Sequence, residues 1–120
     1  GKLGLNDQKD RLNPCLIGKL RGKAILQICA GTWHSMALVA YPPMTGGGWV
    51  YTWGSGYHGQ LAQDMKTLSL VPEVIEEFLE LHLLVKFIAT GSHHCAAITR
   101  DGELYTWGSN QYGCLARYVI

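Results

Sequence analysis

One pentapeptide occurs twice in this chain, and that repetition limits the folds available to it more than any other feature. Tyr-Thr-Trp-Gly-Ser occupies residues 51–55 and again residues 105–109. A second element, Gly-x-Leu followed by a small residue, occurs at residues 1–4, 59–62 and 113–116. Because similarity at a fixed period indicates structural units that stack on one another, we expect a chain built from repeats.

A longer match sets the repeat boundaries. Residues 30–38 correspond to residues 90–98 in the positions of glycine, histidine and the apolar side chains. With the Gly-x-Leu elements as starting points, we predict a first repeat at residues 1–58, a second at residues 59–112 and the start of a third at residues 113–120. Since two repeats are few for such an array, we expect a fragment of a longer repeat protein.

Each repeat has the pattern of short strands separated by turns. Residues 35–39 and 95–99 are short, mainly apolar runs, and each is followed by a run that ends in Tyr-Thr-Trp. In the second repeat Asp101 and Gly102 connect the two runs, and Asp-Gly is a strong signal for a tight hairpin. In the first repeat residues 41–48 contain two prolines and a glycine triplet, which predict a protruding loop.

One segment favours a helix on local grounds. Residues 73–87 place apolar side chains at helical spacing, with glutamates between them. The corresponding segment of the first repeat contains two glycines, which disfavour a helix. Giving the repeat precedence, we predict a short strand after Pro72, one helical turn near residues 76–81 and a strand at about residues 84–90.

The residues shared by the copies form a framework. In the first copy it comprises Gly31, His34, Trp53, Gly54, Gly59, Leu61 and Pro72, and in the second Gly91, His94, Trp107, Gly108, Gly113 and Leu115. Its order and spacing resemble the repeats of the regulator of chromosome condensation family over essentially the whole chain. The resemblance implies an all-β fold, a partial β-propeller with about two four-stranded antiparallel blades of a seven-bladed ring. The remaining blades of that propeller would then be partners of this chain.

The chain departs from the family pattern at the end of the Gly-x-Leu element. Where the family usually has Gly-Gln-Leu-Gly, this sequence has alanine, at Ala62 and at Ala116. If the glycine of the family has a positive φ angle, these alanines either strain the backbone or reshape the turn.

The chemistry of the framework suggests structural roles. We expect Gly31 to allow a turn that a side chain would block, and His34 to begin the next strand while its imidazole bonds neighbouring backbone. We expect Trp53 to fill the wedge between blades and Gly54 to let the chain turn beneath the ring. Their counterparts in the second copy have the same expected roles, because a residue that recurs in each blade serves a need of every blade.

Patterns for catalysis and metal binding are weak. His93, His94 and Cys95 are consecutive, but neighbouring side chains of a strand point to opposite faces and cannot bind one ion together. Zinc-type spacings such as Cys-x-x-Cys are absent from the sequence. Residues 54–59 spell Gly-x-Gly-x-x-Gly, but no strand-helix-strand unit surrounds them. We therefore predict a chain that is not an enzyme and has no catalytic residue, metal site or cofactor.

Charge and cysteine content narrow the class of partner. The net formal charge of +1 gives no general attraction to nucleic acid or to anionic membranes. No apolar run approaches the roughly 18 residues needed to span a bilayer. Four cysteines without disulfide or zinc spacing suit a reducing compartment. We expect a cytoplasmic or nuclear protein that binds neither nucleic acid nor membrane.

Three interpretations of function remain open. The first is a protein-interaction module in small-GTPase signalling or a regulatory scaffold, in which the neutral loop offers Tyr41, Met44 and Trp49 to a partner. The second comes from the resemblance, because the founding member of the family is a guanine nucleotide exchange factor for a small GTPase. No exchange residue can be assigned in this sequence. The third is that two repeats do not form a stable unit by themselves.

Overall fold

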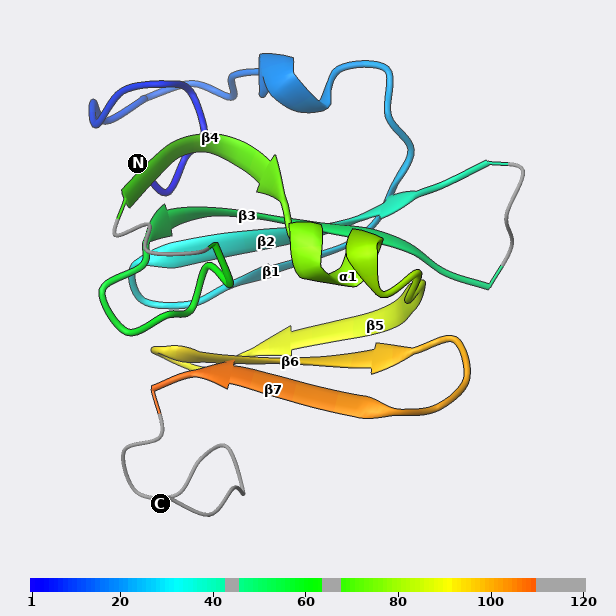
Figure 1. Ribbon diagram of the computed structural model, residues 1–120. Helices are drawn as coiled ribbons and strands as arrows, with labels where there is room; N and C mark the ends of the chain where they lie inside the picture. Colours follow the sequence, from blue (N-terminus) through cyan, green and yellow to red (C-terminus); the bar gives the residue numbers. More distant parts are fainter. Residues whose placement is uncertain (43–45, 64–67, 110–120) are drawn as a thin grey trace.

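Strands dominate the regular secondary structure in the part that the computed structural model describes, residues 1–42, 46–63 and 68–109 (Figure 1). The strands are β1 (Ile25–Ala30), β2 (His34–Ala40), β3 (Gly48–Ser55), β4 (Leu68–Val74), β5 (Val85–Thr90), β6 (His94–Thr99) and β7 (Leu104–Gly108). The helical elements are a 3-10 turn, η1 (Gly18–Leu20), and one short α-helix, α1 (Glu76–Glu80).

The strands form two antiparallel meanders. Strands β1 to β4 make the first meander and β5 to β7 the second, each strand pairing with the next. One residue pair, Gly48 with Val85, joins β3 to β5, so the seven described strands form a single open sheet. The predicted all-β class is confirmed.

The two meanders have the same strand register. In the first, His34 at the start of β2 lies opposite Gly54, and in the second, His94 at the start of β6 lies opposite Gly108. The inner hairpin of each meander also has a register shift at the same place, just after the first residue of β1 and of β5. Because such a shift increases the local twist of a strand pair, both hairpins have the same curvature.

The prediction for the segment around Pro72 was wrong. A strand was expected after this residue, but β4 runs through it and ends two residues later. Pro72 lies between Ser69 and Glu73, where the β3–β4 register shifts. Proline has no N–H to donate, and a strand edge or an irregular pair is where a sheet tolerates it. The helical turn and the strand that were predicted next are confirmed as α1 and β5.

The apolar core occupies both faces of the first meander. The larger cluster, where the two meanders meet, contains Met36, Leu38, Val50, Ile75, Phe78, Val85, Ile88, Cys95 and Ala97. A smaller cluster under η1 contains Leu20, Ala37, Val39 and Trp53. Successive side chains of a strand point to opposite faces, so neighbouring residues of β2 enter different clusters. Strand β2 is therefore buried on both sides, as expected for a strand inside a propeller blade.

Candidate interaction surfaces

The two framework tryptophans make the same hydrogen bond. The indole Nε1 of Trp53 donates to the carbonyl oxygen of Lys2 at 2.6 Å, and that of Trp107 donates to the carbonyl oxygen of Gln60 at 2.9 Å. Lys2 and Gln60 are the middle residues of two successive Gly-x-Leu elements. Each indole therefore ties the end of a third strand to the Gly-x-Leu element that begins the same repeat.

A second pair of side chains reaches the same two carbonyl groups. The hydroxyl of Ser35 donates to Lys2 at 2.9 Å, and the thiol of Cys95 donates to Gln60 at 3.4 Å. Ser35 and Cys95 occupy the same place in the two repeats, one residue into β2 and β6. Each carbonyl oxygen thus accepts two side-chain donors, which fixes the loop against the sheet.

The imidazole of His34 lies between the repeats. It is fully buried, and its Nε2 lies 2.7 Å from Thr90 Oγ1 and 3.3 Å from Cys95 Sγ. The Thr90 hydroxyl is within donating distance of the carbonyl of His94, so its oxygen is free to accept from Nε2. The expectation that this ring bonds backbone was wrong, because β5 and β6, on either side of their connecting turn, bring the side chains of Thr90 and Cys95 within reach of Nε2.

Burial sets the protonation of this cluster. The pKa of His34 falls to about 4, chiefly because burial disfavours the charged ring and secondarily because of His93 and His94. Burial also raises the pKa of the Cys95 thiol to about 12. Both groups are therefore neutral near pH 7, and an inert thiol beside an uncharged imidazole serves packing and hydrogen bonding.

Gln27 fastens β1 to β5. Its Oε1 accepts from the backbone N–H of Ile88 at 2.8 Å, and its Nε2 donates to the backbone carbonyl of Ile88 at 2.6 Å. The thiol of Cys29 lies 3.3 Å from the same carbonyl. The sequence did not single out Gln27, because the second repeat has Phe87 at that place. We call Gln27, Cys29, His34, Ile88, Thr90 and Cys95 the inter-repeat seam.

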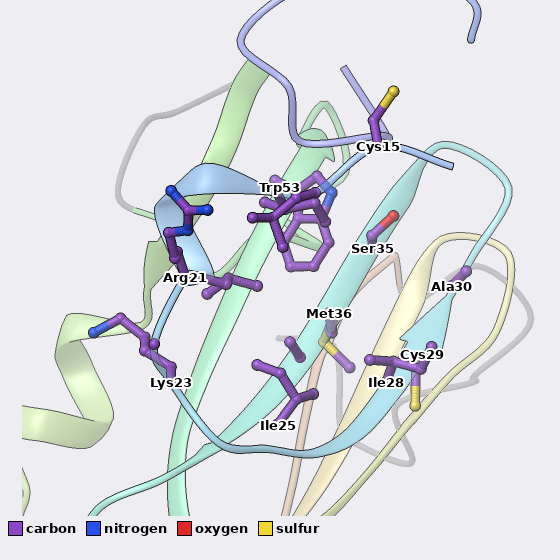
Figure 2. A pocket seen from close by; sticks show the side chains of 15 residues that line it. Cys15, Arg21, Lys23, Ile25, Ile28, Cys29, Ala30, Ser35, Met36 and Trp53 are labelled. Carbon is purple, nitrogen blue, oxygen red and sulfur yellow. The ribbon is translucent and has the colours of Figure 1, made fainter. Parts of the chain in front are cut away.

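An apolar groove lies on the outer face of the first meander. It has a volume of about 730 Å³ and runs between η1 and β1, with Trp53 at one end and Ile25 and Ile28 at the other (Figure 2). Ile28 is 74% exposed, whereas Ile88, its counterpart in β5, is fully buried. The surface around Ile88 on the second repeat is covered by the first repeat. The groove is the equivalent surface of the first repeat, and it is exposed.

The predicted partner loop is only partly described. Tyr41 is 46% exposed and packs on Trp49, with ring centroids 5.1 Å apart and planes tilted by 55°. Met44 lies outside the described residues. Gly46 approaches the aliphatic part of Arg100, so the loop lies beside the β6–β7 turn of the second repeat.

The other framework residues lie in turns, in the core and, for Gly54 and Gly108, at the ends of β3 and β7. Gly31 and Gly91 stand in the turns before β2 and β6, where an added Cβ would lie 2.2 Å and 2.3 Å, respectively, from the ring of the following histidine. Gly54, Gly59 and Gly108 have positive φ angles, and Leu61 and Pro72 are fully buried. Gly113, Leu115 and the predicted third repeat lie outside the described residues.

The described residues show neither a metal-binding cluster nor a membrane-spanning helix. Among residues 1–42, 46–63 and 68–109, no three His, Cys, Asp or Glu side chains are grouped so that they could hold a metal ion. No helix in this part of the chain is long and apolar enough to cross a membrane.

Sequence profiles identify the repeat. The profile of the regulator of chromosome condensation (RCC1) repeat matches residues 1–38 and 47–98, and a second RCC1 repeat profile matches residues 85–114. The chain belongs to the RCC1 repeat family. The resemblance inferred from the framework residues is confirmed.

Relatives of this RCC1-repeat chain are longer proteins. It is 38% identical over 115 residues to the ultraviolet-B receptor UVR8 of Arabidopsis thaliana, covering 96% of this chain and 24% of UVR8. It is 35% identical over 116 residues to the probable E3 ubiquitin-protein ligase HERC4 of Homo sapiens, covering 96% of this chain and 10% of HERC4. The chain therefore spans a quarter or less of the length of these relatives.

Solved structures of other proteins share the fold. Prp20p from Saccharomyces cerevisiae, described with its binding to Gsp1p and histones, superposes with a TM-score of 0.70 at 29% identity, covering 89% of this chain and 26% of Prp20p. Human WBSCR16 gives a TM-score of 0.60 at 32% identity, covering 76% of this chain and 22% of WBSCR16. The predicted partial propeller is thereby confirmed.

Proposed function

We propose that this chain is a protein-binding part of an RCC1-type propeller. The observation that carries the proposal is the inter-repeat seam, in which Gln27 and His34 of one repeat bond the strands of the next. Such a seam holds two meanders in a fixed relation, so their loops form one preorganised surface. The description of Prp20p with Gsp1p and histones supports a protein partner.

The loop between β2 and β3 is the first candidate contact. Tyr41 and Trp49 present aromatic surface beside the turn at Arg100, and aromatic side chains are enriched at protein interfaces. We expect that replacing residues 42–47 with Asp-Gly, the turn of the second repeat, removes at least one partner captured by the intact parent protein. Capture of every partner by that variant would remove this loop from the proposal.

The groove next to β1 is proposed as the seat of another repeat. Ile28 lines this groove, and its counterpart Ile88 is buried against the first repeat. A preceding repeat seated in the groove would bury Ile28 in the same way. On this reading the predicted units 1–58 and 59–112 are neighbouring blades, and further blades of the ring are obligatory partners. Ile28→Asp should leave the 120-residue chain folded yet destabilise a longer parent by about 3 kcal/mol or more, because there the charge would be buried. Equal melting temperatures of the longer parent and its variant would refute this seat.

Guanine nucleotide exchange on a small GTPase is the second candidate. It is supported by the founding member of the family and by the Gsp1p binding described for Prp20p. Exchange needs no covalent chemistry from the factor, which agrees with the neutral buried thiol and imidazole. The decisive measurement is release of a fluorescent guanine nucleotide from a panel of small GTPases, with the intact parent protein added. No acceleration across the panel would rule exchange out.

A reducing compartment, the cytosol or the nucleus, is the proposed location. Cys15, Cys29 and Cys95 are free thiols among the described residues, which suits such a compartment. The family does not fix the location, since one relative, RUG3 of Arabidopsis thaliana, is named as mitochondrial.

A further inference from the structure

Aromatic rings, including two imidazoles, and one lysine gather at the end of the sheet opposite the loop of Tyr41. We call Lys2, Trp33, Tyr57, His58 and His93 the His–Trp rim. The turns before β2 and β6, the segment after β3 and the N-terminal residues all lie at this end (Figure 1). The two turns touch, because the backbone N–H of Thr32 donates to the carbonyl of Ser92 at 3.3 Å. The rim therefore spans both repeats.

Hydrogen bonds hold the backbone of the rim at Trp33 and His93. The carbonyl of Trp33 accepts from the N–H of Ser55 at 2.8 Å, and the carbonyl of His93 accepts from the N–H of Ser109 at 2.9 Å. Both bonds extend strand pairing past the ends of the strands. A partner would meet a backbone that is already fixed at these two residues, so less conformational entropy would be lost on binding.

The rim rings are accessible and arranged in two pairs. Trp33 is 53% exposed, and the ammonium of Lys2 lies 5.1 Å from its ring centroid. His58 and His93 meet edge to face with centroids 4.8 Å apart, and Tyr57 beside them is 75% exposed. Exposed tryptophan and tyrosine next to donor groups are typical of the residues that carry binding energy at interfaces.

The charge of the rim has one sign. Residues 1–4, 31–33, 56–60 and 91–93 contain no aspartate or glutamate, and Lys2 is their one lysine or arginine. Imidazole N–H groups can donate to a carboxylate, as an ammonium does. A nucleic acid would need several phosphate-neutralising cations, and one lysine does not supply them.

We propose that the His–Trp rim binds an acidic segment of a partner protein, with carboxylates at Lys2, His58 and His93 and an apolar side chain against Trp33 and Tyr57. This inference rests on the proposed function of the chain as a protein-binding module. It adds a second surface and the chemistry of the segment that the surface recognises.

The test uses a fluorescein-labelled, glutamate-rich peptide with a central leucine and its glutamine counterpart. The glutamate peptide should bind the full chain at least about tenfold more tightly, because only it offers carboxylates. Trp33→Ser and Lys2→Gln should each weaken binding by about fivefold, and both side chains are exposed, so folding should be unchanged. Leu104→Ser, an exposed apolar side chain at the start of β7 and at the other end of the sheet, is the control and should bind as the unmodified chain does.

Three results would overturn the inference. They are equal binding of the two peptides, unchanged binding by both rim variants, and tighter binding of a labelled single-stranded DNA than of the glutamate peptide. A parent protein that captures partners through residues 42–47 while the rim variants behave normally would retain the proposed function and remove only the rim. If the rim variants lose peptide binding while the parent that lacks residues 42–47 still captures every partner, the rim is retained and the loop is removed from the proposed function.

Discussion

Strands β1 and β5 occupy the same place in the two repeats but have different surroundings. Ile28 of β1 is 74% exposed, whereas Ile88 of β5 is fully buried. The two residues have the same type, the same position in the repeat and the same strand register. What differs is the neighbour, since β5 has β1 against it and β1 faces the groove. In a repeat protein, burial is thus a property of the contact between units.

The segments before these strands differ in another way. Residues 18–20 form a 3-10 turn, and residues 76–80 form an α-helical turn. Glycines at positions 18 and 22 weaken helix formation in the first segment, whereas glutamates begin the helix in the second. Both segments nevertheless place an apolar side chain, Leu20 or Phe78, near a framework tryptophan. Local propensity sets the type of turn, and packing sets its position.

The largest expected effect tests the difference between β1 and β5 directly. Ile88→Ala should lower the free energy of unfolding by about 2 to 5 kcal/mol, because it leaves a cavity in the larger cluster. Ile28→Ala, the matched change on the exposed face, should cost at most about 1 kcal/mol. Chemical denaturation of both variants measures the two values. Equal losses would mean that β1 is buried in solution, for example by a second copy of the chain.

The next effect concerns the turns before β2 and β6. In Gly31→Ala the new Cβ would lie 2.2 Å from His34 Cε1 and 2.7 Å from the carbonyl oxygen of Gly91. In Gly91→Ala the nearest atoms all belong to the ring of His94. We expect a loss of about 3 kcal/mol for the first change and less for the second, because a ring can move more easily than paired backbone. Thermal unfolding measures the difference: the melting temperature of Gly31→Ala should be the lower of the two, and the reverse order would contradict this explanation.

Lowering the pH should reduce the stability of the folded chain through His34, which is buried in the seam. Unfolded, His34 takes up a proton near its ordinary pKa of 6.5, and folded, its pKa is about 4. Between these pH values the unfolded state binds more protons, so the free energy of unfolding decreases as the pH is lowered. We expect a loss of about 1 to 3 kcal/mol by pH 4.

The control for acid sensitivity is a pair of variants. His34→Gln should reduce the dependence of stability on pH in this window, and His94→Gln, the matched change in the second repeat, should retain it. A profile that is the same in both variants would show that His34 is not the group responsible.

The smallest effect is at Ala62, the departure from the family pattern. Its φ angle is 50°, a left-handed conformation that an alanine adopts at a cost and a glycine adopts freely. We expect Ala62→Gly to raise the free energy of unfolding by about 0.5 kcal/mol, after the greater flexibility of glycine in the unfolded chain is included. Ala40→Gly in β2 is the control and should be destabilising. A loss of stability in both would mean that the methyl group of Ala62 contributes more through packing than the backbone loses through strain.

The hydrogen-bond partners in the seam could not be predicted from the sequence. The position of His34 at the start of β2 was predicted, but its bond to Thr90 was not, because the two residues are 56 positions apart. Gln27 left no signal, since a single polar residue in a strand has no partner until the fold supplies one. The roles expected for the tryptophans rested on their recurrence, whereas the carbonyl groups that receive them are known only from the structure.

The sequence by itself determined the period of the chain, the positions of its turns and the all-β class, because glycine, proline and alternating apolar residues act over short distances. The tertiary structure alone decided which copy of each repeated residue is buried, which side chains bond across the seam and which rings reach the His–Trp rim. The physical reason is that identical short-range patterns meet different neighbours once the chain folds, and burial and hydrogen bonding depend on those neighbours.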